Sequence, residues 1–203
     1  RKITSTNGEC GDEVTYSIES TTLTITGRGK MYNYGALDAP WYQERSIKTI
    51  NIGSGVTSIG DYCFWGLSIS NVLIPNTITI IGSHSFGYCG SLKNIIIPQS
   101  VETLGSSVFE MSNLENIEIP DTVKNYGEKI LLMCLYLKNA KLSKSFTVIN
   151  SGTFSQCKRL INVSFPENLV EIQTMAFWEC NALQYLKLSK ILVSRLFKVV
   201  MNS

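Results

Sequence analysis

The sequence predicts a solenoid of short, stacked parallel β-strands that begins with a β-hairpin cap. Two observations predict it: a proline recurs at a fixed spacing, and the residues around each proline repeat one apolar pattern. The first three prolines of the series are 23 and 22 residues apart, and serine takes two later positions. A fixed period in the twenties is typical of solenoids, in which each unit buries its apolar face against its neighbours. The positions are Pro75, Pro98, Pro120, Ser143, Pro166 and Ser189.

Each of these positions closes a short run in which alternate residues are apolar, and Gly53 takes the same place after an earlier run. Alternation places one side of a strand in the core and the other in solvent. Proline ends the strand because it has no amide hydrogen to donate to the ladder. Stacked copies therefore predict a parallel sheet with strands roughly 4.8 Å apart. The runs are Ile50–Ile52, Val72–Ile74, Ile95–Ile97, Ile117–Ile119, Ala140–Leu142, Val163–Phe165 and Leu186–Leu188.

The rest of each unit predicts an irregular or short helical return segment that carries one large apolar side chain into the core. These side chains are Phe64, Phe86, Phe109, Leu131, Phe154 and Phe177. Three residues after the large residue, four units have a cysteine, at Cys89, Cys134, Cys157 and Cys180. We interpret this column as small buried thiols in a tightly packed place. Cys10 and Cys63 lie outside the column, and their partners are not predicted.

The two ends of the chain depart from the repeat. Val14–Ile18 and Leu23–Thr26 both alternate, which predicts a β-hairpin. We expect residues 1–46 to form a β-rich cap in which Trp41 and Tyr42 pack on the first repeat, and residues 47–189 to form the repeats. Residues 190–203 abandon the pattern, and they are either a capping strand or short helix, or a truncated unit.

Composition excludes several functions. The net charge of +2 provides no basic field for nucleic acid. The sequence contains no run of about 18 apolar residues, so this segment is not expected to insert into a membrane. The chain begins at Arg1 without an initiator methionine or an apolar signal segment, as a mature or trimmed chain does.

No catalytic, metal or cofactor site is predicted. His84 is the only histidine, and triads and most metal sites need an imidazole beside a second functional group. We expect His84 to be exposed and inert. Glu115, Glu118 and Asp121 are carboxylates on an open strand, and a solvated charged patch is a better interpretation than a glycosidase pair in a cleft. We therefore expect a protein that is not an enzyme.

The exposed side of the predicted sheet, expected to be concave, is the candidate surface for a partner. Its asparagine column is as consistent with inter-strand hydrogen bonds as with binding. Trp65 and Trp178 follow the core phenylalanines and should point to the convex side, where we expect packing. Asn162-Val163-Ser164 is a glycosylation sequon on the candidate surface. The first column is Asn71, Asn94, Asn116, Asn139, Asn162 and Tyr185, and the second is Leu73, Ile96, Glu118, Lys141, Ser164 and Lys187.

The pattern I(G)xxxFxxCxxLxxIxIP resembles the BspA-like class of leucine-rich repeats, which is related to the Treponema-type repeat. The resemblance covers about residues 47–189, and the segments 8–11, 23–31 and 40–42 resemble the leader that precedes such repeats. It implies a leucine-rich-repeat solenoid on a surface protein. It also implies an extracellular or cell-surface adhesin that binds a protein or glycoprotein of host cells or matrix. Two other hypotheses stay open: a carbohydrate-binding module that uses Trp65, Trp178 or the asparagines, and a structural spacer. The oligomeric state is not predicted.

Overall fold

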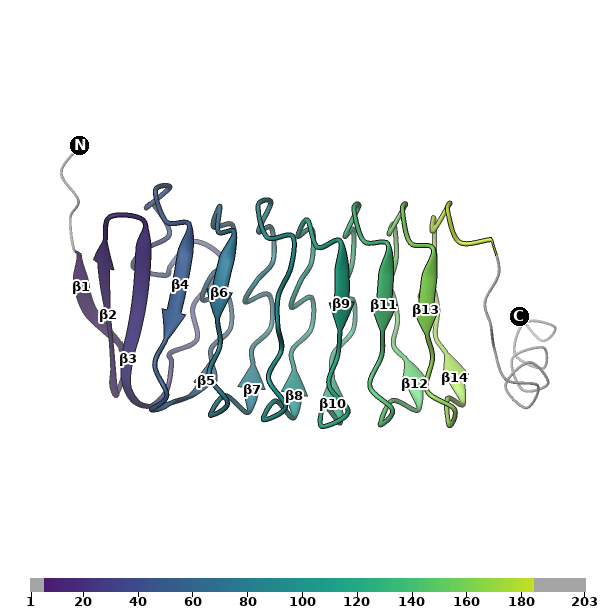
Figure 1. The fold of residues 1–203 in the computed structure, drawn as a ribbon, viewed down its shortest axis with the longest axis horizontal. Coiled ribbons are helices and arrows are strands. Elements are labelled where there is room, and N and C mark those ends of the chain that lie inside the picture. The colour runs from purple at the N-terminus through teal and green to yellow at the C-terminus, as the bar shows by residue number, and fades with distance from the viewer. Residues whose placement is uncertain (1–5, 185–203) are drawn as a thin grey trace.

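The computed structural model describes residues 6–184, and it shows a solenoid of stacked coils behind an antiparallel β-meander (Figure 1). The predicted fold class is therefore confirmed. The predictions for Tyr185, Lys187, the strand at Leu186–Leu188 and the segment 190–203 lie outside the described residues.

The N-terminal strands form the predicted hairpin with one additional strand. Strands β2 (Glu13–Glu19) and β3 (Thr22–Lys30) pair antiparallel, with Glu19 opposite Thr22 at the turn. Strand β1 (Asn7–Gly11), which the alternation did not predict, pairs antiparallel with β2. The long strand β3 then pairs in parallel with both β4 and β5, so the meander is hydrogen-bonded to the first coil.

Trp41 joins this N-terminal part to the repeats, as predicted. Its side chain is fully buried, and its Nε1 donates a 2.7 Å hydrogen bond to the carbonyl oxygen of Cys63. Its ring stacks on Phe64 with centroids 6.0 Å apart. From there the large apolar side chains of successive coils continue as one buried column, in which Phe86 lies 5.4 Å from Phe64 and 6.0 Å from Phe109.

The first ladder of the solenoid consists of the predicted strands that precede the prolines. In the register, Asn139 lies opposite both Asn116 and Asn162, so equivalent residues of successive coils are neighbours. The middle residues Ile117 and Ala140 are buried, while their neighbours in sequence are exposed. The strands are β4 (Thr49–Ile52), β6 (Asn71–Leu73), β9 (Asn116–Glu118), β11 (Asn139–Lys141) and β13 (Asn162–Ser164).

This ladder is interrupted at residues 94–96, between β6 and β9. A strand was predicted over Ile95–Ile97, but the segment pairs with neither neighbouring strand. Ile95 and Ile97 are buried and Ile96 is exposed, so the predicted alternation of side chains is confirmed although the predicted strand is absent. The segment keeps its place in the stack because its two buried isoleucines pack in the core.

The second ladder runs along the other side of each coil. It is continuous from β3 to β10 and resumes between β12 and β14. Strands β10 and β12 do not pair, and the Tyr126 hydroxyl links them instead. It donates a hydrogen bond to Val148 O at 2.8 Å and accepts one from Val148 N at 3.3 Å. The strands are β5 (Val56–Ile59), β7 (Ile80–Ile81), β8 (Thr103–Leu104), β10 (Asn125–Tyr126), β12 (Val148–Ile149) and β14 (Glu171–Ile172).

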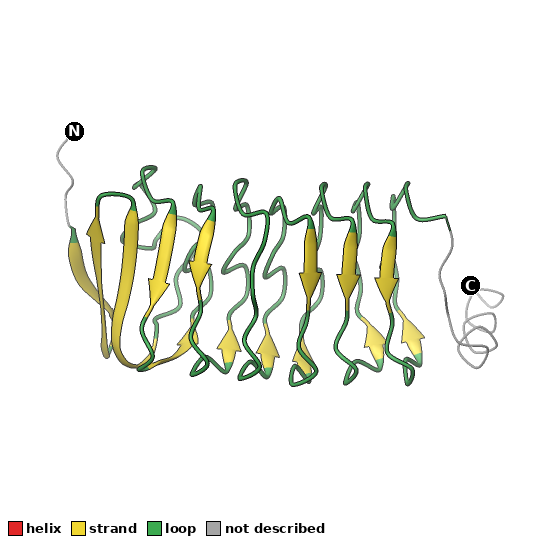
Figure 2. Cartoon of the chain, viewed as in Figure 1, coloured by secondary structure: helices red, strands yellow, loops and turns green. Residues whose placement is uncertain are grey.

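The return segments are irregular, as predicted, but contain no helix anywhere in residues 6–184 (Figure 2). Two residues before and two residues after Phe86, His84 and Tyr88 have φ angles of 55° and 57°. The same two positions have positive φ in the other units from Tyr62 to Glu179. A left-handed conformation costs about 1–2 kcal/mol per residue. It is offset by bonds to the next coil, such as His84 N to Ser106 O at 2.9 Å and Phe86 N to Val108 O at 2.9 Å. A helical turn would direct these amides along its own axis instead.

Candidate functional site

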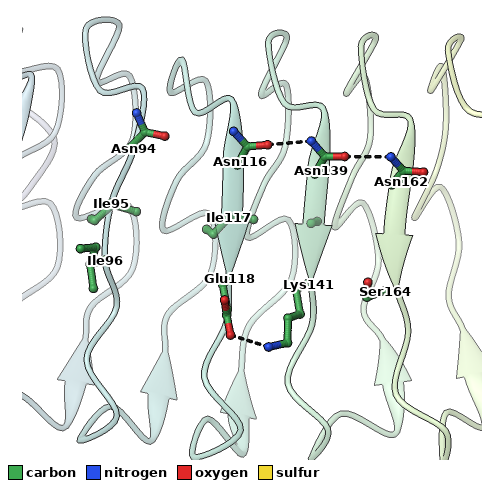
Figure 3. A pocket seen from close by; sticks show the side chains of 11 residues that line it. Asn94, Ile95, Ile96, Asn116, Ile117, Glu118, Asn139, Lys141, Asn162 and Ser164 are labelled. Carbon is green, nitrogen blue, oxygen red and sulfur yellow. Dashed lines mark hydrogen bonds and ion pairs between the residues drawn. The ribbon is translucent and has the colours of Figure 1, made fainter.

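The outward side chains of the first ladder, together with those of the unpaired segment 94–96, form one exposed surface, which we call the asparagine face. Figure 3 shows the part of it from Asn94 to Ser164. A shallow hollow of about 440 Å³ lies over its middle and C-terminal part. Sequence alternation placed these residues on one side, and the structure brings them together there; Tyr185 and Lys187 lie outside the described residues. The asparagine face comprises Asn71, Leu73, Asn94, Ile96, Asn116, Glu118, Asn139, Lys141, Asn162 and Ser164.

Three of its asparagines form a hydrogen-bonded amide ladder. Asn139 Nδ2 donates to Asn116 Oδ1 at 2.7 Å, and Asn162 Nδ2 donates to Asn139 Oδ1 at 2.9 Å (Figure 3). The ladder stops at Asn116, next to the interruption of the sheet. Among the described residues, the side-chain amides of Asn94 and Asn71 have no hydrogen-bond partner. The structural interpretation therefore holds for three asparagines, while two present free amides.

Ion pairs cross between the coil of β9 and the coil of β11. On the asparagine face, Lys141 Nζ lies 2.6 Å from Glu118 Oε1, and this hydrogen bond raises the pKa of Lys141. Above and below it, Glu115 pairs with Lys138 at 3.7 Å, and Asp121 with Lys144 at 3.3 Å.

These contacts neutralise the three carboxylates that the sequence singled out. The backbone amide of Lys144 donates to Asp121 Oδ1 at 2.9 Å, and this bond is the main cause of the lowered pKa of Asp121. Exposed pairs of this kind contribute about 0–1 kcal/mol each. The paired carboxylates are thus a solvated charged seam, as predicted, in which each acid faces a lysine.

The N-terminal end of the asparagine face is apolar. The side chain of Ile96 is 83% exposed and that of Leu73 is 57% exposed, while Ile96 has the largest exposed fraction among the exposed large hydrophobic residues of the described chain. The free amides of Asn71 and Asn94 stand two residues before them on the same face. The second column therefore changes from apolar through charged to small and polar, as its sequence predicts.

His84 differs from the prediction of an exposed, inert side chain. It is half-buried, its Nδ1 lies 3.2 Å from Glu110 Oε2, and its ring stacks on Tyr62 with centroids 4.5 Å apart. Each of these contacts joins neighbouring coils. The residues are about one repeat apart in the sequence, and this spacing could have predicted the contacts. In the described part of the chain, no three His, Cys, Asp or Glu side chains are grouped so that they could hold a metal ion.

The cysteine column is structural, as predicted. All six cysteines are free thiols, and five of them are buried. Cys134 Sγ donates to the carbonyl oxygen of Phe109 at 3.2 Å, and Cys89, Cys157 and Cys180 make the same bond to Phe64, Leu131 and Phe154 in their preceding coils. Burial raises the pKa of Cys89 and Cys134 to about 12, so these thiols remain protonated at neutral pH.

The two tryptophans of the repeats have different surroundings. Trp65 packs between Tyr42, at 6.1 Å between ring centroids, and Tyr88, at 4.9 Å, so the predicted packing is confirmed for it. Two protein rings therefore already pack against Trp65, and it is partly buried. Trp178 is 46% exposed.

Comparison with known proteins agrees with this geometry. A family model described as the BspA-type leucine-rich repeat region matches residues 38–138 and 132–198, with six copies. No curated protein shows significant similarity to the chain. Among solved structures, a leucine-rich repeat protein from Bacteroides ovatus is 26% identical with a TM-score of 0.69, over 85% of this chain and 51% of its own. The chain thus spans about half the length of that protein. The Treponema pallidum leucine-rich repeat protein has the same fold, with a TM-score of 0.65 at 20% identity over 92% of this chain and 93% of its own.

Proposed function

The chain belongs to the BspA-type leucine-rich-repeat family, and from this premise we propose that it is an extracellular adhesion module that binds a protein or glycoprotein through the asparagine face. The observation that carries the proposal is the asparagine face itself, a broad surface that crosses successive coils and combines exposed apolar side chains with amides. Solenoids bind their partners through such extended surfaces. Leucine-rich-repeat solenoids are typically binding scaffolds without catalytic activity.

Three features support a macromolecular partner. The hollow on this face is shallow and open, whereas small-molecule sites enclose most of their ligand. Exposed Ile96 and Leu73 provide apolar area of the kind found at the centre of protein interfaces. The surface carries no aromatic side chain among its described residues, and sugar-binding sites depend on such platforms for stacking. Host-cell and matrix glycoproteins are the partners that the family resemblance suggests, and a cell-surface location follows from the same proposal.

The test is binding of the purified chain to a panel of immobilised extracellular-matrix glycoproteins. A double variant, Asn94→Arg with Ser164→Arg, adds two bulky charges to the asparagine face at positions that make no side-chain hydrogen bond in the described structure. The control, Asn76→Arg with Gln99→Arg, adds the same charge at exposed turn positions off this face. We expect saturable binding that the face variant weakens at least about tenfold and the control changes less than about twofold.

Two outcomes would contradict the proposal. If no matrix glycoprotein binds at tens of micromolar, the proposed class of partner is wrong. If both double variants bind equally well, the partner uses another surface. Protection of Trp178 fluorescence by oligosaccharides would then favour the carbohydrate-binding hypothesis.

A further inference from the structure

The asparagine face has two halves, which differ in whether their polar side chains are bonded to one another. In the C-terminal half, the amides of Asn116, Asn139 and Asn162 bond to one another, and Glu118 bonds to Lys141. In the N-terminal half, by contrast, the side-chain amides of Asn71 and Asn94 have no partner within residues 6–184, and both neighbouring side chains are exposed and apolar. A ligand can bond to these free amides without first breaking a bond within the protein, whereas the amides of the C-terminal half are already bonded to one another.

We propose that the N-terminal half, formed by Asn71, Leu73, Asn94 and Ile96, is a docking site for a short, uncharged, extended polypeptide segment with an apolar anchor. The inference rests on the proposed function and narrows it: it names which part of the asparagine face carries the affinity and what chemistry the partner presents. From the sequence alone, the charged residues of this face were as good candidates for binding a partner as these four residues.

Charge complementarity argues for an uncharged segment. The nearest charges on this face, Glu118 and Lys141, neutralise one another at 2.6 Å. A charged ligand group near them would have to separate that pair or lose its own hydration without gaining a partner. Residues 71–96 contribute only one charged side chain, Lys93, and its Nζ lies 3.8 Å from Glu115. The four residues of this half are therefore uncharged, and the one charged side chain within residues 71–96 is already paired.

The free amides argue for a peptide backbone. A carboxamide has an N–H donor and a C=O acceptor, and a peptide group has the same pair, so one can bond to the other at both ends. Asn71 and Asn94 hold equivalent positions in neighbouring coils, so one short extended segment can reach both amides. The segment then runs along the solenoid axis, across the strands.

The apolar pair argues for an aliphatic or aromatic anchor. Ile96 and Leu73 lie two residues beyond the free amides on the same side of their segments, so a side chain directed down from the bound backbone reaches them. Covering most of one isoleucine side chain corresponds to an affinity gain of about 10- to 100-fold. Ile96 lies in the unpaired segment 94–96 and is more exposed than Leu73. Ile96 is therefore the principal anchor contact.

The experiment uses a library of linear peptides displayed on phage, selected on the whole chain, with the best peptide then synthesised. We expect selected peptides that lack charge and share an aliphatic or aromatic residue. Their affinity should fall at least about tenfold in Ile96→Asp and about threefold or more in Asn94→Ala. A control off this face, Asn76→Asp at an exposed turn position, adds the same charge as Ile96→Asp and should change affinity less than about twofold. Affinity should also be nearly constant between 50 and 500 mM NaCl. A roughly tenfold rise in ionic strength would weaken binding if attraction between charges contributed to it.

All of these substitutions are at exposed positions, so thermal unfolding curves should show that each variant is folded. The inference is wrong if the selected peptides share a charged residue, or if Ile96→Asp leaves their affinity unchanged. It is also wrong if no selected peptide binds this chain more tightly than it binds an unrelated solenoid. The result separates from that of the proposed function. If a matrix glycoprotein no longer binds the double arginine variant but still binds Ile96→Asp, the proposed function stands and this inference is wrong.

Discussion

Asn139 donates a 2.7 Å hydrogen bond from its side-chain Nδ2 to Oδ1 of Asn116, its register partner on the neighbouring parallel strand. Asn139 also accepts a bond from Asn162, so it is the middle member of the amide ladder. Asn94 occupies the equivalent position two coils earlier and has no such bond among the described residues. The same residue type in the same column therefore has a structural role in one half of the face and a free amide in the other.

This difference predicts unequal effects on stability. Asn139→Ala removes two hydrogen bonds between coils, and we expect it to lower the free energy of unfolding by about 1–2 kcal/mol. Asn94→Ala removes none and should change it by less than about 0.5 kcal/mol. Urea denaturation followed by circular dichroism measures both. Equal losses in the two variants would mean that the ladder does not stabilise the solenoid.

Asp121 predicts a loss of stability in acid. Because the pKa of Asp121 is lowered in the folded chain, chiefly by the hydrogen bond from the Lys144 amide, its contribution is present above the ordinary aspartate pKa. It is lost as pH falls through the lowered folded value. The difference in Tm between wild type and Asp121→Asn should therefore shrink as pH falls from 6 to about 2.5.

The control for this titration is Glu102→Gln. Glu102 is exposed and forms no ion pair in the described part of the chain, so its variant should track the wild type over the same pH range. If the Tm difference for Asp121→Asn is constant with pH, the bond from the Lys144 amide does not favour the charged carboxylate.

Gly82 predicts a strong steric effect between coils. A Cβ at Gly82 would lie 2.5 Å from the backbone carbon of Gly60 and 2.6 Å from the amide nitrogen of Asp61, and neither is free to move. We expect Gly82→Ala to destabilise the fold by about 2–3 kcal/mol. Gly90→Ala is the matched control, since a Cβ there meets nothing within 4 Å. It should be neutral or slightly stabilising, and Tm values for both variants test the contrast.

Much of the fold follows from sequence periodicity, because each coil repeats the same burial pattern. Alternation identified the inward residues even at 95–97, where the ladder itself is absent. The return segments could not be predicted in detail. Apolar spacing is compatible with a helical turn, whereas the left-handed residues at His84 and Tyr88 are fixed by hydrogen bonds to the next coil. Such bonds depend on a neighbouring unit that local sequence does not describe.

The candidate site shows the same limit. The sequence placed the asparagines in one column but gave no reason to separate Asn94 from Asn116. What separates them is whether the strands pair, and that depends on backbone geometry between coils. The pairing of Glu118 with Lys141, by contrast, follows from their equal positions in units that are 23 residues apart.

The cysteine column predicts which thiols react in the native protein. Burial raises the pKa of Cys134 to about 12 and that of the less buried Cys180 to about 11, so both are protonated at pH 8 and differ mainly in access. We expect iodoacetamide at pH 8 to label Cys180 first, while the five buried thiols stay unlabelled. Mass spectrometry of the peptides measures the labelling of each cysteine.

The same labelling in concentrated urea is the control, and all six cysteines should then react. A second comparison tests the thiol hydrogen bond. Cys134→Ser keeps a donor for the Phe109 carbonyl, and Ser112 already fills the same position one coil earlier. It should therefore be tolerated better than Cys134→Val, which leaves that buried carbonyl without this bond at a cost of about 1–3 kcal/mol. Rapid labelling of Cys134 in native buffer, or equal stability of the two variants, would show that the column is not closed by these bonds.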